Sequence, residues 1–360
     1  MRRILIVSIL LFISISFFYE HTHAYSKHEP IRGIYINAPN TNKTVFNKYL
    51  LLVKRTELNA MVIDIKDDDG HLTFLPSKHS SYYKVSHPYI TNPKALLHTL
   101  KKNNIYPIAR IVTFKDRVLA NSRPDWSFQT SRGLWKNSRG DSFTNPYLRE
   151  VWDYNIGMAI EAAKLGFKEI QFDYVRFPER FEKFEHTLSY TKKPFDDNLD
   201  RNRVTAITEF VKYARKKLQP YQVKLSIATF GIVTVIPEAQ GIGQNFSEIA
   251  TNVDAISAMI YPSHWTGMKG IKKPDLKPYE TVQNYAKKEK KRLNKLENRP
   301  ITRPWVQDFT ASWLGKGNYK PYGKKEVEDQ IRALHSQGID EFLLWNSSNK
   351  YTTGVDYTPY

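Results

Sequence analysis

Residues 168–178 read KEIQFDYVRFP, and the rest of the chain is arranged around this stretch. Its first half is apolar and β-branched enough for a strand that is covered on both faces, and Pro178 ends the strand pairing. Asp173 and Arg176 stand where that strand ends. Because parallel α/β proteins bind ligands at the carboxyl ends of their strands, these charged residues are site candidates. The alternative is that Asp173 and Arg176 merely neutralise each other.

Seven further stretches predict strands, and helical periodicity fills most intervals between them. Besides the start of 168–178, strands are expected at 31–36, 60–66, 106–114, 223–230, 253–261, 302–309 and 341–345, and helices at 44–56, 93–103, 146–165, 201–218, 279–296 and 324–337. With no linker-like stretch between them, these elements favour a single (β/α)8 TIM barrel over residues 25–360.

An open doubly wound sheet is the competing architecture. Polar residues follow nearly every predicted strand, whereas an open sheet concentrates its site at one switch point, so the barrel is favoured. The barrel would carry long βα loops. The connection 117–145 is rich in Trp, Arg, Ser and Gly and is long enough to indicate a binding loop.

The composition predicts an exported basic protein. Residues 1–24 combine a charged start, an apolar run and a small-residue cleavage site, as in a signal peptide; an uncleaved membrane anchor is the alternative. The 360 residues include no cysteine, which excludes disulfides and thiolate metal ligands. The formal net charge of +18 favours attraction to polyanions. We expect a secreted or cell-wall-associated protein that meets an anionic wall or capsule polymer. Nucleic acid is not an expected partner, because no reader motif is present.

In a barrel, the strand ends converge on one rim, which here would carry carboxylates, amides and aromatic rings. Sugars are bound in this way, with polar partners for the hydroxyls and aromatic faces for the rings. The expected substrate-binding residues on this rim are Asp64, Lys66, Asp116, Arg176, Tyr261, His264, Gln307 and Trp345.

Hydrolysis of a glycosidic bond usually needs two carboxyl groups. Asp173 is the predicted nucleophile or base, because Arg176 and neighbouring amides could hold it ionised. Asp308 is the predicted acid, because a carboxyl group packed between aromatic rings can have a raised pKa.

Three other carboxyl groups could supply the acid, and each has a structural alternative. Asp64 could pair with Lys66, Asp116 could cap the turn before Arg117, and Glu238 stands in a loop expected to be exposed.

No metal or cofactor is expected. Residues 67–70, DDDG, resemble part of a calcium loop, but the first and twelfth ligand positions would fall on Ile65 and Pro76. The histidines include no pair at the spacing of a metal-binding helix. Residues 241–244, GIGQ, lack the glycine spacing and the lysine of a phosphate-binding loop.

Six separated motifs resemble, in order, the bacterial putative glycosyl hydrolase domain family. They are DIKD at 64–67, ARIVTFKD at 109–116, FKEIQFDYVRFP at 167–178, GIGQ at 241–244, MIYPSH at 259–264 and RPWVQDF at 303–309. The resemblance runs from about residue 31 to residue 345 and implies an exported TIM barrel related to glycoside hydrolases. It supports the rim residues named above and adds Gln244, and the last motif adds Trp305 to the predicted substrate-binding set.

Two departures from the family pattern each alter an aromatic contact. Residues 142–146, SFTNP, stand where a tryptophan before Asn-Pro is expected, and Trp265 stands where tyrosine often follows Ser-His. The departures bear on the identity of the sugar and leave the carboxylates untouched.

Together these features predict an exported glycoside hydrolase that acts on a cell-wall or extracellular polysaccharide by a two-carboxylate mechanism. The main alternative is a protein on the same barrel that binds polysaccharide without cutting it. A third is a basic structural protein held to an anionic polymer by charge alone, whose binding would vanish at moderate salt. No oligomeric state is predicted.

Overall fold

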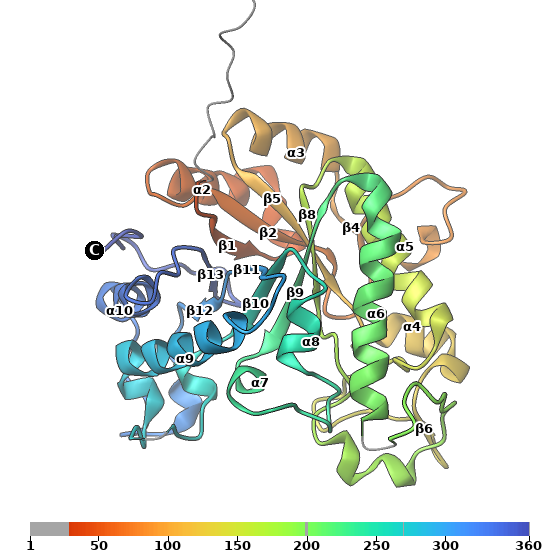
Figure 1. The fold of residues 1–360 in the computed structure, drawn as a ribbon. Coiled ribbons are helices and arrows are strands. Elements are labelled where there is room, and N and C mark those ends of the chain that lie inside the picture. Colours follow the sequence, from red (N-terminus) through yellow and green to blue (C-terminus); the bar gives the residue numbers. More distant parts are fainter. Residues whose placement is uncertain (1–28, 199–200, 269, 360) are drawn as a thin grey trace, which may run out of the picture. The chain divides into compact units, whose positions relative to one another are not determined.

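The computed structural model describes residues 29–198, 201–268 and 270–359, and its compact unit Ile31–Tyr360 contains a closed barrel (Figure 1). Within the described residues, eight parallel strands pair in a ring: β1 (Arg32–Ile36), β2 (Ala60–Lys66), β5 (Tyr106–Val112), β8 (Glu169–Asp173), β9 (Lys224–Phe230), β10 (Ala255–Met259), β12 (Trp305–Gln307) and β13 (Phe342–Trp345). Strand β1 pairs with both β2 and β13, so the ring closes. The (β/α)8 prediction is confirmed, and the open sheet is excluded.

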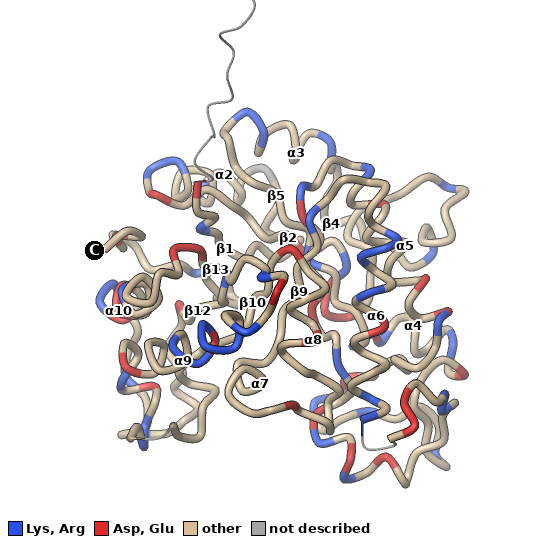
Figure 2. Tube along the Cα trace, in the orientation of Figure 1, with Lys and Arg blue, Asp and Glu red and all other residues tan. Residues whose placement is uncertain are grey.

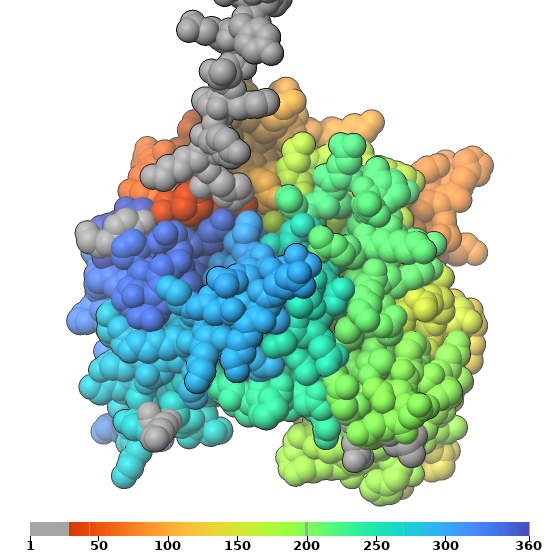
Figure 3. All heavy atoms as spheres, in the orientation of Figure 1, coloured from red at the N-terminus to blue at the C-terminus, as the bar shows by residue number. Residues whose placement is uncertain are grey.

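The chain order is visible on the molecular surface. Figure 3 shows the blue C-terminal segments beside the red-orange segments that follow β1, as the pairing of β1 with β13 requires.

The predicted signal peptide, residues 1–24, lies outside the described residues. No helix of the described part of the chain is long and apolar enough to cross a membrane.

The predicted helices form as α2 (Lys43–Lys54), α3 (Pro93–Lys102), α5 (Arg149–Leu165), α6 (Asn202–Leu218), α9 (Pro278–Leu293) and α10 (Lys324–His335). The loops contain further short elements that the sequence did not predict: α4 (Arg117–Ser122), α7 (Ile232–Val235), α8 (Phe246–Ala250), β3 (Leu72–Phe74), β4 (Ser86–Ile90), β6 (Gln129–Thr130) and β7 (Gly133–Leu134). The strand expected at 302–309 divides into β11 (Ile301–Thr302) and β12, because Pro304 has no N–H to donate to the ladder.

The central strand β8 is apolar on one side only. Ile170 and Phe172 point outward into the apolar layer beneath the helices. Because successive side chains alternate across a strand, Glu169, Gln171 and Asp173 all point into the barrel. The strand is covered on both faces, as expected, since all of its residues are buried. Its inner face is polar, however, and β8 supplies one polar side chain to each level of the interior.

Each level of the barrel interior is tied together by polar contacts. At the amino ends of the strands, Arg303 donates to Glu169 (2.8 Å) and Glu341 (2.7 Å). In the middle, Gln171 donates to two serine hydroxyls and accepts from Trp305 Nε1 (3.1 Å). Asp173 belongs to the level at the carboxyl ends. These polar groups of the interior are thus paired, since an unpaired one would be costly there, and they lie beside an apolar cluster that includes Val62, Ile108 and Leu343.

Glu289 on α9 is a buried acid outside these networks. Neither of its carboxyl oxygens has a hydrogen-bond partner among the described residues. Burial raises the pKa of Glu289 from 4.5 to about 7, and the nearby hydroxyls of Thr302 and Tyr285 offset this only in part. The folded protein therefore keeps a proton that the unfolded chain has lost.

We expect this carboxyl group to make the fold less stable as the pH rises from about 4.5 to about 7, because the folded pKa is the higher one. The free energy of unfolding should fall by up to about 3 kcal/mol over that window from this group. Denaturant titrations of Glu289→Gln should lack this part of the decrease. Equal pH slopes for the variant and the native protein would contradict the expectation.

Candidate functional site

Arg110 on β5 joins the acidic groups at the carboxyl ends of the strands. Its Nη1 donates to Asp64 Oδ1 (2.7 Å) and to Asp68 Oδ2 (3.2 Å). Its Nε and Nη2 both donate to Asp173 Oδ2, at 3.0 and 2.8 Å. Arg110, Asp64 and Asp173 are buried, so one guanidinium is shared by carboxylates that water screens little.

The surroundings of Asp64 and Asp68 move their pKa values apart. Burial raises the pKa of Asp64 to about 6, although Arg110 and the Tyr35 hydroxyl, which donates to Oδ2 at 2.5 Å, act against it. Burial also acts on Asp68, but Arg110 and Lys115 outweigh it and lower that pKa to about 2. Divergent carboxyl groups of this kind are typical of acid–base sites.

Asp173 is held by Arg110 and by a backbone amide. The N–H of Tyr174 donates to Asp173 Oδ1 at 2.7 Å. Tyr174 adopts a left-handed backbone conformation with φ of 52°, which is unusual for a bulky residue and is found where function offsets strain. The Asp173 side chain is 9% exposed. The carboxylate therefore reaches the rim in a fixed position.

Arg176 does not bond to Asp173, so the two residues do not form the simple neutral pair. Its guanidinium donates to Phe177 O (3.2 Å) and to Glu179 Oε1 (3.4 Å). The Tyr174 ring lies 4.8 Å from Arg176 and 4.7 Å from Lys115. The arginine that holds Asp173 comes from the neighbouring strand.

Aromatic rings form one side of the rim. Trp345 stacks on Tyr35 at 4.3 Å, and the Arg110 guanidinium lies 5.4 Å from the Trp345 ring. Tyr261 is 5.1 Å from the exposed ring of His264. Partial burial among such rings lowers the pKa of His264. This wall could hold the apolar faces of sugar rings.

A cavity of about 530 Å³ opens beside this wall, lined among others by His264, Asp308, Trp313 and Trp345. Trp313 is 64% exposed and stacks on Phe309. The cavity offers aromatic surface to a ligand next to a carboxyl group.

Asp308 is buried and bound by a segment that follows β13. Thr352 donates to it twice, from Oγ1 (2.6 Å) and from its backbone N–H (3.0 Å). Burial raises the pKa of Asp308, and the two Thr352 contacts offset this in part. No contact joins Asp308 to Arg110 or Asp173 within the described residues.

Several predicted binding residues instead lie in buried structural contacts. A β-bulge after Asp64 turns Lys66 away from the interior, where it pairs with Asp116 (2.6 Å) and donates to Asn155. Asp116 also caps α4, so the capping alternative describes it. Gln244, Gln307 and Trp305 are buried as well, bonded to Val175 O, Asp275 and Gln171 respectively.

The remaining acid candidate, Glu238, is half-buried in a loop. It accepts from Arg201 (3.3 Å), Gln240 and Asn245, and these hydrogen bonds and Arg201 outweigh burial and lower its pKa. That environment suits an ionised carboxylate, not an acid.

Sequence reasoning missed Arg110, Asp68 and Tyr35 as site residues. A signal existed for Arg110: it is a charged residue inside an apolar strand, which is costly unless it is paired. In the sequence, Asp68 stands out only as part of an incomplete calcium loop. Among the described residues, no group of three or more histidine, aspartate and glutamate side chains could hold a metal ion.

The chain is similar to solved structures of glycoside hydrolases. The structure of the PgaB (BpsB) glycoside hydrolase domain from Bordetella bronchiseptica has a TM-score of 0.60 and 15% identity, over 88% of this chain and 94% of that one. A β-galactosidase from the psychrophilic Marinomonas ef1 has a TM-score of 0.61 and 12% identity, over 88% and 54%. At such identities the likeness shows the fold alone.

A hypothetical protein from Ruminiclostridium thermocellum is 32% identical over 54% of this chain and 96% of its own, with a TM-score of 0.46. No curated protein matches the chain. A family model described as "Putative glycosyl hydrolase domain" matches residues 33–351.

Replacing Arg110 with methionine should destabilise the protein by about 3–5 kcal/mol at pH 7, because buried carboxylates would lose their counter-charge. The loss should shrink as the pH falls, since protonated carboxyl groups no longer need the arginine. Denaturant unfolding of Arg110→Met and native protein at pH 7 and pH 4 measures both values. A loss of equal size at the two pH values would contradict this account.

Proposed function

Because this chain belongs to the family described as "Putative glycosyl hydrolase domain", we propose that it hydrolyses glycosidic bonds in a cell-wall or extracellular polysaccharide. The fold is the barrel that known glycoside hydrolases share. The proposal includes export, with residues 1–24 as the signal, and an extracellular carbohydrate polymer as the partner. What the site residues do on such a substrate follows from their contacts.

The observation that carries the proposal is the setting of Asp173. Its carboxylate stands at the end of the central strand, with Arg110 on one oxygen and a backbone amide on the other. These contacts fix the carboxylate in position. A fixed carboxylate beside an aromatic wall suits attack on a sugar carbon or activation of a water molecule.

Asp308 is the proposed acid. It lines the cavity of about 530 Å³, and burial raises its pKa, which favours the protonated form that an acid needs. To reach a leaving oxygen it must release Thr352. Asp64 also has a raised pKa, but its oxygens are bonded to Arg110 and Tyr35 inside the barrel. We therefore assign proton donation to Asp308.

One observation favours the alternative of a protein that binds polysaccharide without cutting it. Both oxygens of Asp308 accept hydrogen bonds from Thr352, and both oxygens of Asp173 are also bonded. A protein with these acids occupied would keep the aromatic wall and the cavity and would bind a polymer unchanged.

The Asp173→Asn variant should lose about 10²–10⁴-fold in turnover while it still binds polymer, because the amide keeps the shape and loses the charge. The measurement is release of reducing ends from neutral and acidic polysaccharides, with binding recorded in parallel. Glu169→Gln is the matched control: it changes a buried carboxylate that Arg303 binds at the opposite end of the barrel. It should cost stability and leave turnover of the folded protein unchanged. Equal turnover in Asp173→Asn and native protein would eliminate the assignment.

Thr352→Val should move the alkaline limb of the pH–rate profile to higher pH. Loss of the Oγ1 hydrogen bond removes a contact that favours the ionised form, so the pKa of Asp308 should rise further.

Asp308→Asn should spare aryl glycosides with good leaving groups and lose activity on unactivated sugars. If Asp308→Asn slows the hydrolysis of both kinds of substrate equally, another group donates the proton.

A further inference from the structure

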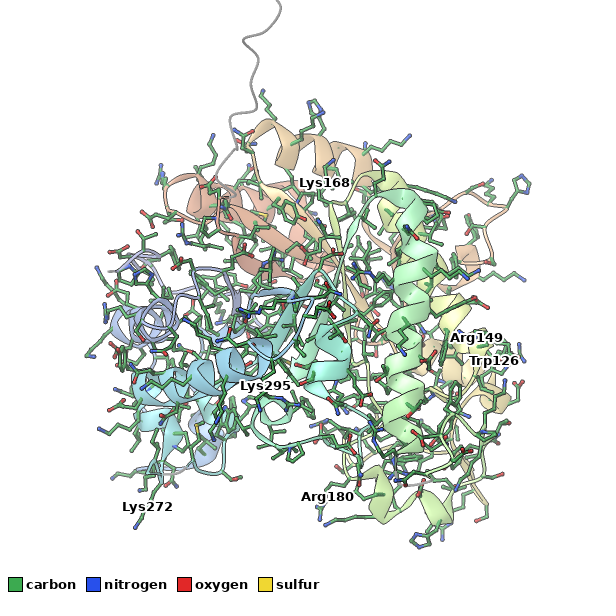
Figure 4. The ribbon with its side chains drawn as sticks, in the orientation of Figure 1. Trp126, Arg149, Lys168, Arg180, Lys272 and Lys295 are labelled. Atoms are coloured by element: carbon green, nitrogen blue, oxygen red, sulfur yellow. The ribbon has the colours of Figure 1, made fainter. Side chains whose placement is uncertain are left out.

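Two loops at the carboxyl ends of the strands enclose a basic, aromatic cavity. It has a volume of about 480 Å³ and lies between residues 135–143, which precede α5, and residues 178–184, which follow β8. Trp135 and Phe184 stack at 4.9 Å in its wall, nearly parallel. Figure 4 labels Arg180 on this loop, near the amino-terminal end of α6, whereas Lys168 lies at the opposite end of the strands.

The charge of this cavity is not balanced from within. Its basic residues are Lys136, Arg139, Arg180 and Lys183, all exposed. The side chains of Lys136, Arg180 and Lys183 form no ion pair with any described residue. Arg139 is 64% exposed and pairs with Asp141 (3.4 Å) and Glu179 (3.5 Å).

Glu179 is the acid that lines the cavity, and it is shared. The carboxylate oxygen that faces Arg139 also accepts from Arg176 at 3.4 Å. The positive charges of Lys136, Arg180 and Lys183 are therefore not neutralised by any residue that lines the cavity. Such a wall favours an anion from solution.

The cavity shares a lining residue with a second cavity, which an acid of the candidate site also lines. A second cavity, of about 200 Å³, is lined by Asp68, Lys115, Arg139 and Asp141 among others. Arg139 lines both cavities, and Asp68 is bonded to the same guanidinium that holds Asp173. A ligand chain that occupied both cavities would run from Asp68, which Arg110 joins to Asp173, toward Arg180.

The other side of the rim differs in charge. Among the residues that line the cavity beside Trp345 and His264, Lys350 is the one lysine or arginine, so this side holds at most one uncompensated cation even when Asp308 is protonated. Both sides offer aromatic faces, but one carries a surplus of cations. The substrate site is thus asymmetric.

We propose that the cavity between residues 135–143 and 178–184 is a subsite for an acidic sugar, one that carries a carboxylate or a phosphate group. The sugar ring would lie against Trp135 and Phe184, and the anionic group would meet Arg139, Arg180 and the two lysines. Arg is suited to this because its planar fork binds carboxylate and phosphate oxygens in pairs. This inference rests on the proposed function, since it names the substrate class of the same rim.

The alternative is that the net charge of +18 attracts any polyanion to the whole surface. Lysines and arginines are also dense along α9, as Figure 2 shows. Lys288 and Lys291 on α9 and Lys295 just after it are exposed and form no ion pair with a described residue. They provide a control with the same charge change.

The test compares two triple variants at constant ionic strength. In one, Lys136, Arg180 and Lys183 become glutamine; in the other, Lys288, Lys291 and Lys295 do. The probes are polygalacturonate, alginate and hyaluronan, each beside its carboxyl-reduced form, and poly(glycerol phosphate). Equilibrium binding to each probe is measured by calorimetry.

We expect the native protein to bind at least one acidic polymer more tightly than its neutral counterpart. The cavity variant should lose about tenfold in that affinity, and the α9 variant much less. Preference for the uronic polymers over poly(glycerol phosphate) assigns the carboxylate, and the reverse assigns the phosphate. Trp135→Ala should weaken the binding of acidic and carboxyl-reduced polymers alike, since it removes a stacking face.

Equal losses in the two triple variants, or no preference for any acidic probe, would overturn the inference. Its failure can be told apart from failure of the hydrolase proposal, because binding needs no turnover. If Asp173→Asn abolishes hydrolysis while the cavity variant binds acidic polymer normally, the hydrolase proposal is supported and the subsite proposal is rejected. If no polymer is cut but the loss is confined to the cavity variant, the subsite stands alone.

Discussion

The buried guanidinium of Arg110 is the contact on which the site depends. It is bonded to Asp64, Asp68 and Asp173, which come from two strands and one loop, and it lies against the Trp345 ring. A single cation thereby fixes acids that would otherwise repel one another and places them beside the aromatic wall. The position of Asp173 and the lowered pKa of Asp68 follow from this arrangement, whereas burial raises the pKa of Asp64 and Arg110 offsets that only in part.

Polar side chains of β8 are paired in the same way at each level of the barrel interior. Glu169 is neutralised by Arg303, Gln171 is bonded to serines and Trp305, and Asp173 is bonded to Arg110. One strand thus contributes to a structural pair at its start and to the candidate site at its end. The difference between the two ends lies in access, because the amino-end pair is covered and the carboxyl end adjoins cavities. Polar pairing alone therefore does not mark a functional residue in this fold.

The sequence predicted the ring of strands well, because apolar runs bounded by polar residues are a local signal. It could not foresee contacts that depend on register. Arg176 is three positions from Asp173, yet the arginine that reaches Asp173 comes from β5, where Arg110 is paired opposite Gln171. Lys66 has the spacing of an inward residue, but the bulge after Asp64 reverses its direction. Thr352 contacts Asp308 across a separation of 44 residues, and no sequence pattern in either segment predicts this contact.

That last contact has a consequence for how the protein is made. Thr352 follows β13, so the carboxyl group of Asp308 acquires both of its hydrogen bonds only from a segment that is translated after all eight strands of the ring. The eight strands of the ring therefore do not themselves supply the partners of this carboxyl group. Completion of the rim depends on the segment after β13 and is a step separate from assembly of the barrel.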